Sequence, residues 1–224
     1  MLKRYPMLRH SADTGDSGPH VVAFVQSCAI RDGVLRETLA DLATTDWGTA
    51  PIVELDDAFG RSPVVRQRML VRRILERALR ERIDFLLLLE DDLEFNLNLR
   101  ENLLCWPPLR KAHYNGHFFA LLFNGGVRFR KFFPDMDCAE VDPATARGSQ
   151  ALVMSHATVR YLVNCWGTEP AEHVDLRMQR LVARVCPILC HVPSLVQHRS
   201  AVSTWGGPPG RALDFDETWR GQRP

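Results

Sequence analysis

The chain has 224 residues, 46% of them hydrophobic, which is enough apolar material for one substantial core. Its 28 basic residues are nearly balanced by 27 acidic residues, so the net charge is +1. Such a balance provides no overall field for a polyanion, and it argues against nucleic acid and anionic membrane surfaces as main partners.

Cysteine usage and the N-terminal segment bear on the compartment. Six cysteines are spread thinly through the sequence: Cys28, Cys105, Cys138, Cys165, Cys186 and Cys190. Thinly spaced thiols in a chain of this size indicate a reducing compartment, so a cytoplasmic location is expected. Residues 1–19 have no continuous apolar stretch behind their basic residues, which favours a flexible leader over a signal peptide. No apolar run approaches the roughly 20 residues that span a bilayer, so no transmembrane segment is expected.

Short apolar runs alternate with helical periodicity from His20 onward, a pattern typical of an α/β fold with a largely parallel sheet. Strands are predicted at residues 21–25, 51–55, 85–89, 117–123, 151–155 and 187–192. Helices are predicted around residues 35–42, 62–78, 159–163 and 178–185. We expect one domain over residues 20–207, followed by a C-terminal loop or lid segment over 208–224.

Three consecutive carboxylates, Glu90, Asp91 and Asp92, directly follow the apolar strand predicted at residues 85–89. In open α/β sheets, ligands bind beyond the carboxyl ends of the strands, so this strand delivers the carboxylates to the edge where a site forms. Adjacent like charges repel one another, and a hard divalent cation such as Mg²⁺ or Mn²⁺ holds them together. The alternative is a solvated acidic turn that caps the next segment.

Arginine dominates the basic residues, and four arginines follow one face of the long helix that is predicted to begin at residues 62–63. These are Arg66, Arg73, Arg77 and Arg80. A row of charges usually marks a solvated helix face. Arg66 is the exception, because it lies near the N-terminus of the helix, where an anion binds favourably.

The stretch over residues 85–95, which contains Glu-Asp-Asp-Leu-Glu, resembles the acidic motif of the GT-A nucleotide-sugar glycosyltransferases. Its form is similar to the variant in N-acetylglucosaminyltransferases and in lipopolysaccharide-type transferases. The resemblance implies a single GT-A (Rossmann-like) α/β domain with a mostly parallel central sheet flanked by helices. It also implies that Asp92 binds Mn²⁺ or Mg²⁺, while Glu90 and Asp91 line the donor.

A second segment, Pro-Ser-Leu-Val-Gln-His ending at His198, is similar to a segment near the end of several GT-A transferases. In that family the histidine commonly completes the metal or diphosphate site, which implies this role for His198. An imidazole is an acceptable Mn²⁺ ligand, and a protonated imidazole donates to phosphate oxygen. Taken alone, a histidine after a strand is more often a structural residue than a ligand.

Two acidic residues, Glu172 and Asp175, lie where inverting GT-A enzymes place the base that deprotonates the acceptor hydroxyl. A carboxylate within hydrogen-bond reach suffices for that step. Asp175 is the preferred base and Glu172 the alternative; a helix cap explains either residue equally well. The turn over residues 148–150 resembles the acceptor-side turn of the same enzymes.

The resemblance also implies that residues after the first strand cradle the nucleotide. Gln26, Ser27 and Arg31 are the candidates, with Arg66 as a diphosphate or base contact. Trp205, beside a Gly- and Pro-rich segment, is a candidate for stacking on a sugar or closing over the donor, and core packing explains it equally well.

The resemblance therefore implies a metal-dependent hexosyl- or N-acetylhexosaminyltransferase, inverting by single displacement. Its donor would be a nucleotide-sugar, with a UDP-sugar favoured, and its acceptor a hydroxyl of a glycan or another molecule. One alternative is a nucleotidyltransferase on a related fold, which normally has a Gly-rich basic loop after the first strand, where residues 25–33 hold one glycine and one arginine. Another is a catalytically inactive module that binds a glycan or protein.

A zinc site is a further alternative. It would use Cys186, Cys190, His191 and His198, whose spacing matches no standard zinc finger.

Overall fold

The computed structural model describes residues 18–58, 60–125, 136–144, 148–171, 173–199 and 210–221. Seven strands form the central sheet: β1 (Val21–Cys28), β2 (Ile52–Asp56), β3 (Phe85–Leu89), β5 (Phe119–Leu121), β6 (Cys138–Val141), β7 (Ala151–Ser155) and β8 (Ile188–His191). A two-stranded sheet pairs β4 (Leu93–Phe95) with β9 (Val196–His198). The helices are α1 (Asp32–Thr44), α2 (Pro63–Ala78), α3 (Leu99–Cys105), α4 (Pro107–Asn115), α6 (His156–Cys165) and α7 (Val174–Val182).

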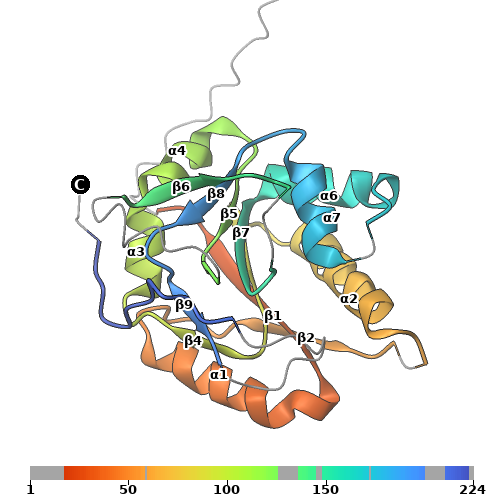
Figure 1. The fold of residues 1–224 in the computed structure, drawn as a ribbon, viewed down its shortest axis with the longest axis horizontal. Coiled ribbons are helices and arrows are strands. Elements are labelled where there is room, and N and C mark those ends of the chain that lie inside the picture. The colour runs from red at the N-terminus through yellow and green to blue at the C-terminus, as the bar shows by residue number, and fades with distance from the viewer. Residues whose placement is uncertain are drawn as a thin grey trace, which may run out of the picture.

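The central sheet has the strand order β2-β1-β3-β7-β5-β8-β6. Strands β2, β1, β3, β5 and β8 point the same way, whereas β7 and β6 run in the opposite direction. The predicted fold class, an α/β domain with a mostly parallel central sheet flanked by helices (Figure 1), is confirmed. Within the described residues, the sheet is mixed because β7 enters it antiparallel between β3 and β5.

Helices cover both faces of this sheet (Figure 1). Helices α2, α6 and α7 pack on one face, while α1, α3 and α4 lie on the other. All five residues of β3 are buried. Leu86 and Leu88 face the core under α2, α6 and α7, while Phe85, Leu87 and Leu89 face the core under α1, α3 and α4. A strand that is buried on both faces typically has a continuous apolar run, whereas a strand with one exposed face alternates apolar and polar residues.

Every predicted strand and helix is present, although the strand expected at residues 117–123 is shorter. Three short strands, β4, β6 and β9, and two helices, α3 and α4, were not predicted. The short strands give only three or four residues of pattern, and Pro107 divides α3 from α4 by beginning the second helix. No helix in the described part of the chain is long and apolar enough to cross a membrane.

The described C-terminal residues, 210–221, pack against the second sheet and α3. Gln197 of β9 accepts from the Ala212 amide and donates to its carbonyl, at 2.9 and 3.0 Å. The side-chain amides of Asn96 and Asn102 both donate to the Trp219 carbonyl, at 2.8 and 3.0 Å. These contacts hold the segment over residues 210–221 in place. The expected site residue Trp205 lies outside the described residues.

Candidate functional site

A pocket of about 350 Å³ opens at the carboxyl ends of β1, β2 and β3. It is lined by every described residue that the sequence had assigned to the donor, the metal or the base: Gln26, Ser27, Arg31, Arg66, Glu90, Asp91, Asp92, Asp175 and His198. Glu172, the alternative base, lies outside the described residues. The position of the pocket agrees with the rule that ligands bind beyond the carboxyl ends of strands in α/β sheets.

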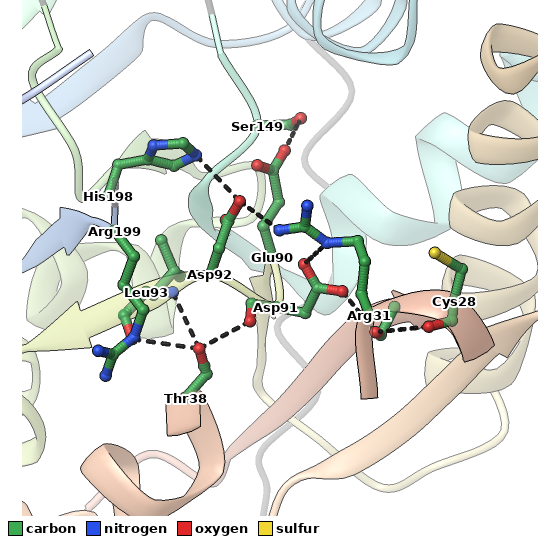
Figure 2. A network of polar contacts seen from close by, with 11 residues as sticks. Cys28, Arg31, Thr38, Glu90, Asp91, Asp92, Leu93, Ser149, His198 and Arg199 are labelled. Carbon is green, nitrogen blue, oxygen red and sulfur yellow. Dashed lines mark hydrogen bonds and ion pairs between the residues drawn. The ribbon is translucent and has the colours of Figure 1, made fainter. Parts of the chain in front are cut away.

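The three carboxylates after β3 differ in the set of residues that each contacts (Figure 2). Glu90 accepts a hydrogen bond from the Ser149 hydroxyl at 2.6 Å. Asp91 accepts from the Ser27 hydroxyl and from Arg31 Nε, the latter at 2.9 Å. Sequence neighbours therefore reach different walls of the pocket, as expected where a strand continues into a turn.

Arg31 joins two of these carboxylates. Its Nη2 lies 2.6 Å from Asp92 Oδ2, while its Nε binds Asp91. Burial alone would lower the pKa of Arg31, but the charges of the two aspartates outweigh it and raise the pKa. The guanidinium is thus a fixed positive charge that partly neutralises the acidic turn, the name used from here on for residues 90–93.

Glu90, Asp92 and His198 each offer a ligand atom, and these three atoms lie within 4.8 Å of one another. His198 Nε2 is 3.3 Å from Asp92 Oδ2. Two buried atoms of the group, Asp92 Oδ1 and His198 Nδ1, have no hydrogen-bond partner among the described residues. Two carboxylates and an imidazole match the ligand preferences of Mn²⁺, and an unsatisfied carboxylate oxygen offers a ligand atom, so these residues fit a divalent cation.

The proximity of these groups shifts their pKa values in different directions. Burial, helped by the charge of Asp92, raises the pKa of Glu90 to about 7, against the opposing hydrogen bond from Ser149. Burial would also raise the pKa of Asp92, but the hydrogen bond with His198 and the charges of His198 and Arg31 bring it below its usual range. The hydrogen bond to Asp92 raises the pKa of His198.

The turn over residues 148–150 connects Asp175 to the acidic cluster. The Gly148 amide donates to Asp175 Oδ2 at 3.0 Å, and the Leu176 amide donates to Oδ1 at 2.8 Å. Ser149 binds Glu90, whose own amide donates to the Gln150 carbonyl at 2.8 Å. Gly148 has φ of +93°, a conformation that glycine adopts readily. The structure thus brings Asp175, in the first turn of α7, into the same pocket as the candidate metal ligands.

Gln26 and Arg66 line the part of the pocket between β1 and α2. Gln26 is only 5% exposed, and neither atom of its side-chain amide has a hydrogen-bond partner among the described residues. Arg66 Nε lies 2.6 Å from Asp56 Oδ2, so a carboxylate holds this guanidinium at the pocket wall. Arg73 and Arg77 pair with Glu54 outside the pocket lining, which agrees with the surface role expected for that row.

The zinc alternative is not supported within the described part of the chain. The one group of three or more potential ligands there is the one containing His198 with two carboxylates. Cys190 donates to Asn124 Oδ1, and His191 Nδ1 bonds the Pro193 carbonyl at 2.7 Å. Burial raises the pKa of Cys186 to about 11, so its thiol holds its proton.

Two polar residues at the acidic turn were missed by sequence reasoning. Thr38 of α1 and Arg199, directly after β9, both form hydrogen bonds with the backbone of the turn. Neither belongs to a recognisable motif, and the position of Arg199 directly after His198 was the only available signal.

No protein-family model matches the chain, and no curated protein shows significant similarity to its sequence. Among solved structures, the chain is similar to a glycosyltransferase involved in the glycosylation of the major capsid of PBCV-1. The two share 11% sequence identity and a TM-score of 0.43, over 81% of this chain and 94% of that chain. A similarity of this size assigns neither a substrate nor a reaction, so the functional assignment rests on the site itself.

Proposed function

We propose that this protein is a metal-dependent glycosyltransferase that moves a sugar from a nucleotide-sugar to a hydroxyl acceptor. The observation that carries the proposal is the group of Glu90, Asp92 and His198 at the end of β3, with an unpartnered Asp92 oxygen inside the pocket. The resemblance of the acidic motif and of the segment ending at His198 supports the same reaction.

Asp92 and His198 are the proposed metal ligands, and Glu90 completes the group. A bound Mn²⁺ or Mg²⁺ would neutralise the charge that develops on the leaving diphosphate. Arg31 carries a permanent positive charge beside Asp92 and would bind the same anionic group, since its guanidinium matches phosphate geometry. The chain would thereby stabilise the leaving group with charges already in place.

Asp175 is the proposed base. Two backbone amides hold its carboxylate and leave further lone pairs for an acceptor hydroxyl. The Gly148 amide links it through the neighbouring Ser149 to Glu90, so the proton acceptor and the leaving-group site contact the same turn. Direct attack of the acceptor hydroxyl on the anomeric carbon, with its proton passing to Asp175, would invert the configuration.

Gln26 and Ser27 are the proposed nucleoside contacts, together with Arg66. The amide of Gln26 offers a donor and an acceptor side by side, which suits the polar edge of a pyrimidine base. A UDP-sugar is therefore the favoured donor, with a hexose or an N-acetylhexosamine as the transferred sugar.

A screen of nucleotide-sugars for hydrolysis, with and without Mn²⁺, tests the proposal. We expect one donor to release a nucleoside diphosphate and free sugar in the presence of metal, and Asp92→Ala to abolish the release. Release of a sugar 1-phosphate with a nucleoside monophosphate would instead indicate chemistry at the phosphate. Absence of both donor binding and turnover across the screen would leave only a non-catalytic binding module.

The role of Asp175 is tested separately, once a donor is known. Asp175→Asn keeps one of the two backbone hydrogen bonds through its amide oxygen and removes the basic carboxylate. We expect transfer to fall at least about 100-fold, in line with general-base catalysis, with donor affinity nearly intact. Full transfer activity in this variant would move the role to Glu172.

A further inference from the structure

Thr38 forms an unusual contact for a threonine within a helix. It is fully buried in α1, and its hydroxyl donates to the Asp91 carbonyl at 2.7 Å while accepting from the Leu93 amide at 3.0 Å. Within helices, such hydroxyls usually bond a carbonyl of the preceding turn. Here both partners lie in the acidic turn, more than fifty positions along the chain. A single hydroxyl therefore holds the backbone on both sides of Asp92 (Figure 2).

Arg199, directly after β9, contacts the same turn. Its backbone amide donates to the Asp92 carbonyl at 2.7 Å, and its Nε donates to the Leu93 carbonyl at 3.2 Å. The far end of its guanidinium pairs with Asp41 of α1. Arg199 thus ties the turn to the same helix that carries Thr38.

These contacts determine where the two candidate metal ligands lie. With the peptide groups before and after Asp92 fixed, the side chain of Asp92 leaves the backbone in one direction. Because Arg199 directly follows His198, its bond to the Asp92 carbonyl also sets the separation of the two ligand side chains, 3.3 Å between His198 Nε2 and Asp92 Oδ2. Neither Thr38 nor Arg199 lines the pocket, so each acts through its neighbours.

We propose that Thr38 and Arg199 are positioning residues that preorganise Asp92 and His198 for a divalent cation. The inference rests on the proposed metal site. It adds the two residues that hold the ligand side chains at their observed separation. Residues that orient ligands in this way typically change metal affinity 10- to 100-fold when they are replaced.

Thr38→Val tests this inference, because valine keeps the shape of threonine and removes the hydroxyl. Mn²⁺ affinity is measured on folded protein from the electron paramagnetic resonance signal of free Mn²⁺. We expect about 10-fold weaker binding in Thr38→Val, and recovery to within about 2-fold of wild type in Thr38→Ser, which restores the hydroxyl. Arg199→Met, which keeps the backbone amide but loses the guanidinium, should weaken binding by a smaller factor.

Thr158→Val is the matched control. Thr158 is also fully buried, and its hydroxyl accepts from the Phe118 amide at 2.9 Å, away from the pocket lining. We expect this variant to lose thermal stability and to bind Mn²⁺ as tightly as wild type. Equal weakening in both threonine variants would show a general effect of lost stability and overturn the inference.

The remaining outcomes separate the two proposals. If wild type binds Mn²⁺ and both Thr38→Val and Arg199→Met bind it equally well, the metal site stands and the positioning role is wrong. If wild type binds no Mn²⁺, with or without a nucleotide-sugar, the proposed function and the positioning role both fail. If Thr38→Val does not fold, Arg199→Met alone tests the positioning role: weaker Mn²⁺ binding than wild type supports it, and equal binding overturns it.

Discussion

Two groups of buried polar side chains lie close to the ends of the central strands, and they differ in how completely they are paired. In the first group, Asn124, Ser194 and Asp214, the carboxylate accepts from Ser194 at 2.6 Å and from Asn124 at 2.8 Å. Asn124 also donates to the His191 carbonyl at 3.0 Å. We call this group the C-terminal polar cluster; each of its buried side-chain atoms has a partner.

The second group, in the pocket, consists of Gln26, Glu90, Asp92 and His198. It contains four buried atoms without a partner among the described residues: both amide atoms of Gln26, Asp92 Oδ1 and His198 Nδ1. A buried polar atom that is left unpaired costs about 1–3 kcal/mol. The comparison indicates that the C-terminal polar cluster holds the fold together, while the pocket group retains unpaired atoms for a ligand.

Two histidines seven positions apart show the same contrast. His191 is fully buried between Trp106 and Trp219, and burial lowers its pKa to about 4. His198 faces Asp92, and that hydrogen bond raises its pKa. One imidazole is therefore a neutral part of the core, and the other belongs to a charged site.

The largest effect is expected from breaking the C-terminal polar cluster. Asp214→Ala leaves the donors on Ser194 and Asn124 unpaired in a buried position. We expect a loss of about 4 kcal/mol in the free energy of unfolding, as two orphaned groups imply. Urea unfolding measures this, and Mn²⁺ affinity of the folded variant should not change. A weaker Mn²⁺ affinity in this variant would contradict the claim that the C-terminal polar cluster serves the fold alone.

Replacing a candidate metal ligand should weaken Mn²⁺ binding more than it lowers the free energy of unfolding. We expect His198→Ala to weaken Mn²⁺ binding about 100-fold, or about 2.7 kcal/mol, because one of three protein ligands is lost. Its free energy of unfolding without metal should fall by only about 1 kcal/mol, because the single hydrogen bond to Asp92 is lost while Asp92 keeps its contact with Arg31. Calorimetric titration and urea unfolding give the two values. Unchanged Mn²⁺ affinity would return His198 to a structural role.

The stability of the protein should depend on pH through His191. Its folded pKa of about 4 lies below the ordinary value of 6.5, so the unfolded chain takes up a proton first as the pH falls. This contribution to stability is fully present above pH 6.5 and is lost as the pH falls toward about 4. From about pH 7.5 to about pH 5 we expect a loss of about 2 kcal/mol. His191→Gln should lack this part of the pH dependence; an identical pH profile would contradict the assignment.

The smallest effect is expected at Gln26. Gln26→Met keeps a similar volume and removes an unpaired buried amide, so the free energy of unfolding should rise by about 1 kcal/mol. Affinity for a nucleoside diphosphate, measured by calorimetry, should fall about 5- to 10-fold, as for the loss of one pair of hydrogen bonds. A variant that is less stable and binds nucleotide normally would show that Gln26 supports the fold instead.

Much of the fold was predictable because it is local in sequence. The run of five apolar residues in β3 identified a buried strand, and the position of Glu90 and Asp92 directly after it placed them at the ligand-binding edge. His198 was found through its resemblance to a known segment, and the structure places its ring beside Asp92.

The features of the fold and of the site that were not predicted depend on contacts between residues far apart in the sequence. Thr38 and Arg199 meet the acidic turn from positions that are more than fifty and more than one hundred residues away, and no periodicity encodes such a pairing. Strands β4 and β9 are three residues long, and among the described residues each pairs only with the other. The complete pairing of Asp214 could not be predicted for the same reason, because its partners lie 20 and 90 positions away.

The central claim is that Asp92 is the principal ligand of a divalent cation. A titration of Mn²⁺ into wild type and Asp92→Asn, with a UDP-sugar present, tests it most directly. Glu169→Gln is the control, because Glu169 is a buried carboxylate paired with Arg180 and Arg184 outside the pocket lining. We predict one Mn²⁺ per chain in wild type and in Glu169→Gln, and binding at least about 100-fold weaker in Asp92→Asn. Equal Mn²⁺ affinity in wild type and Asp92→Asn would contradict the account.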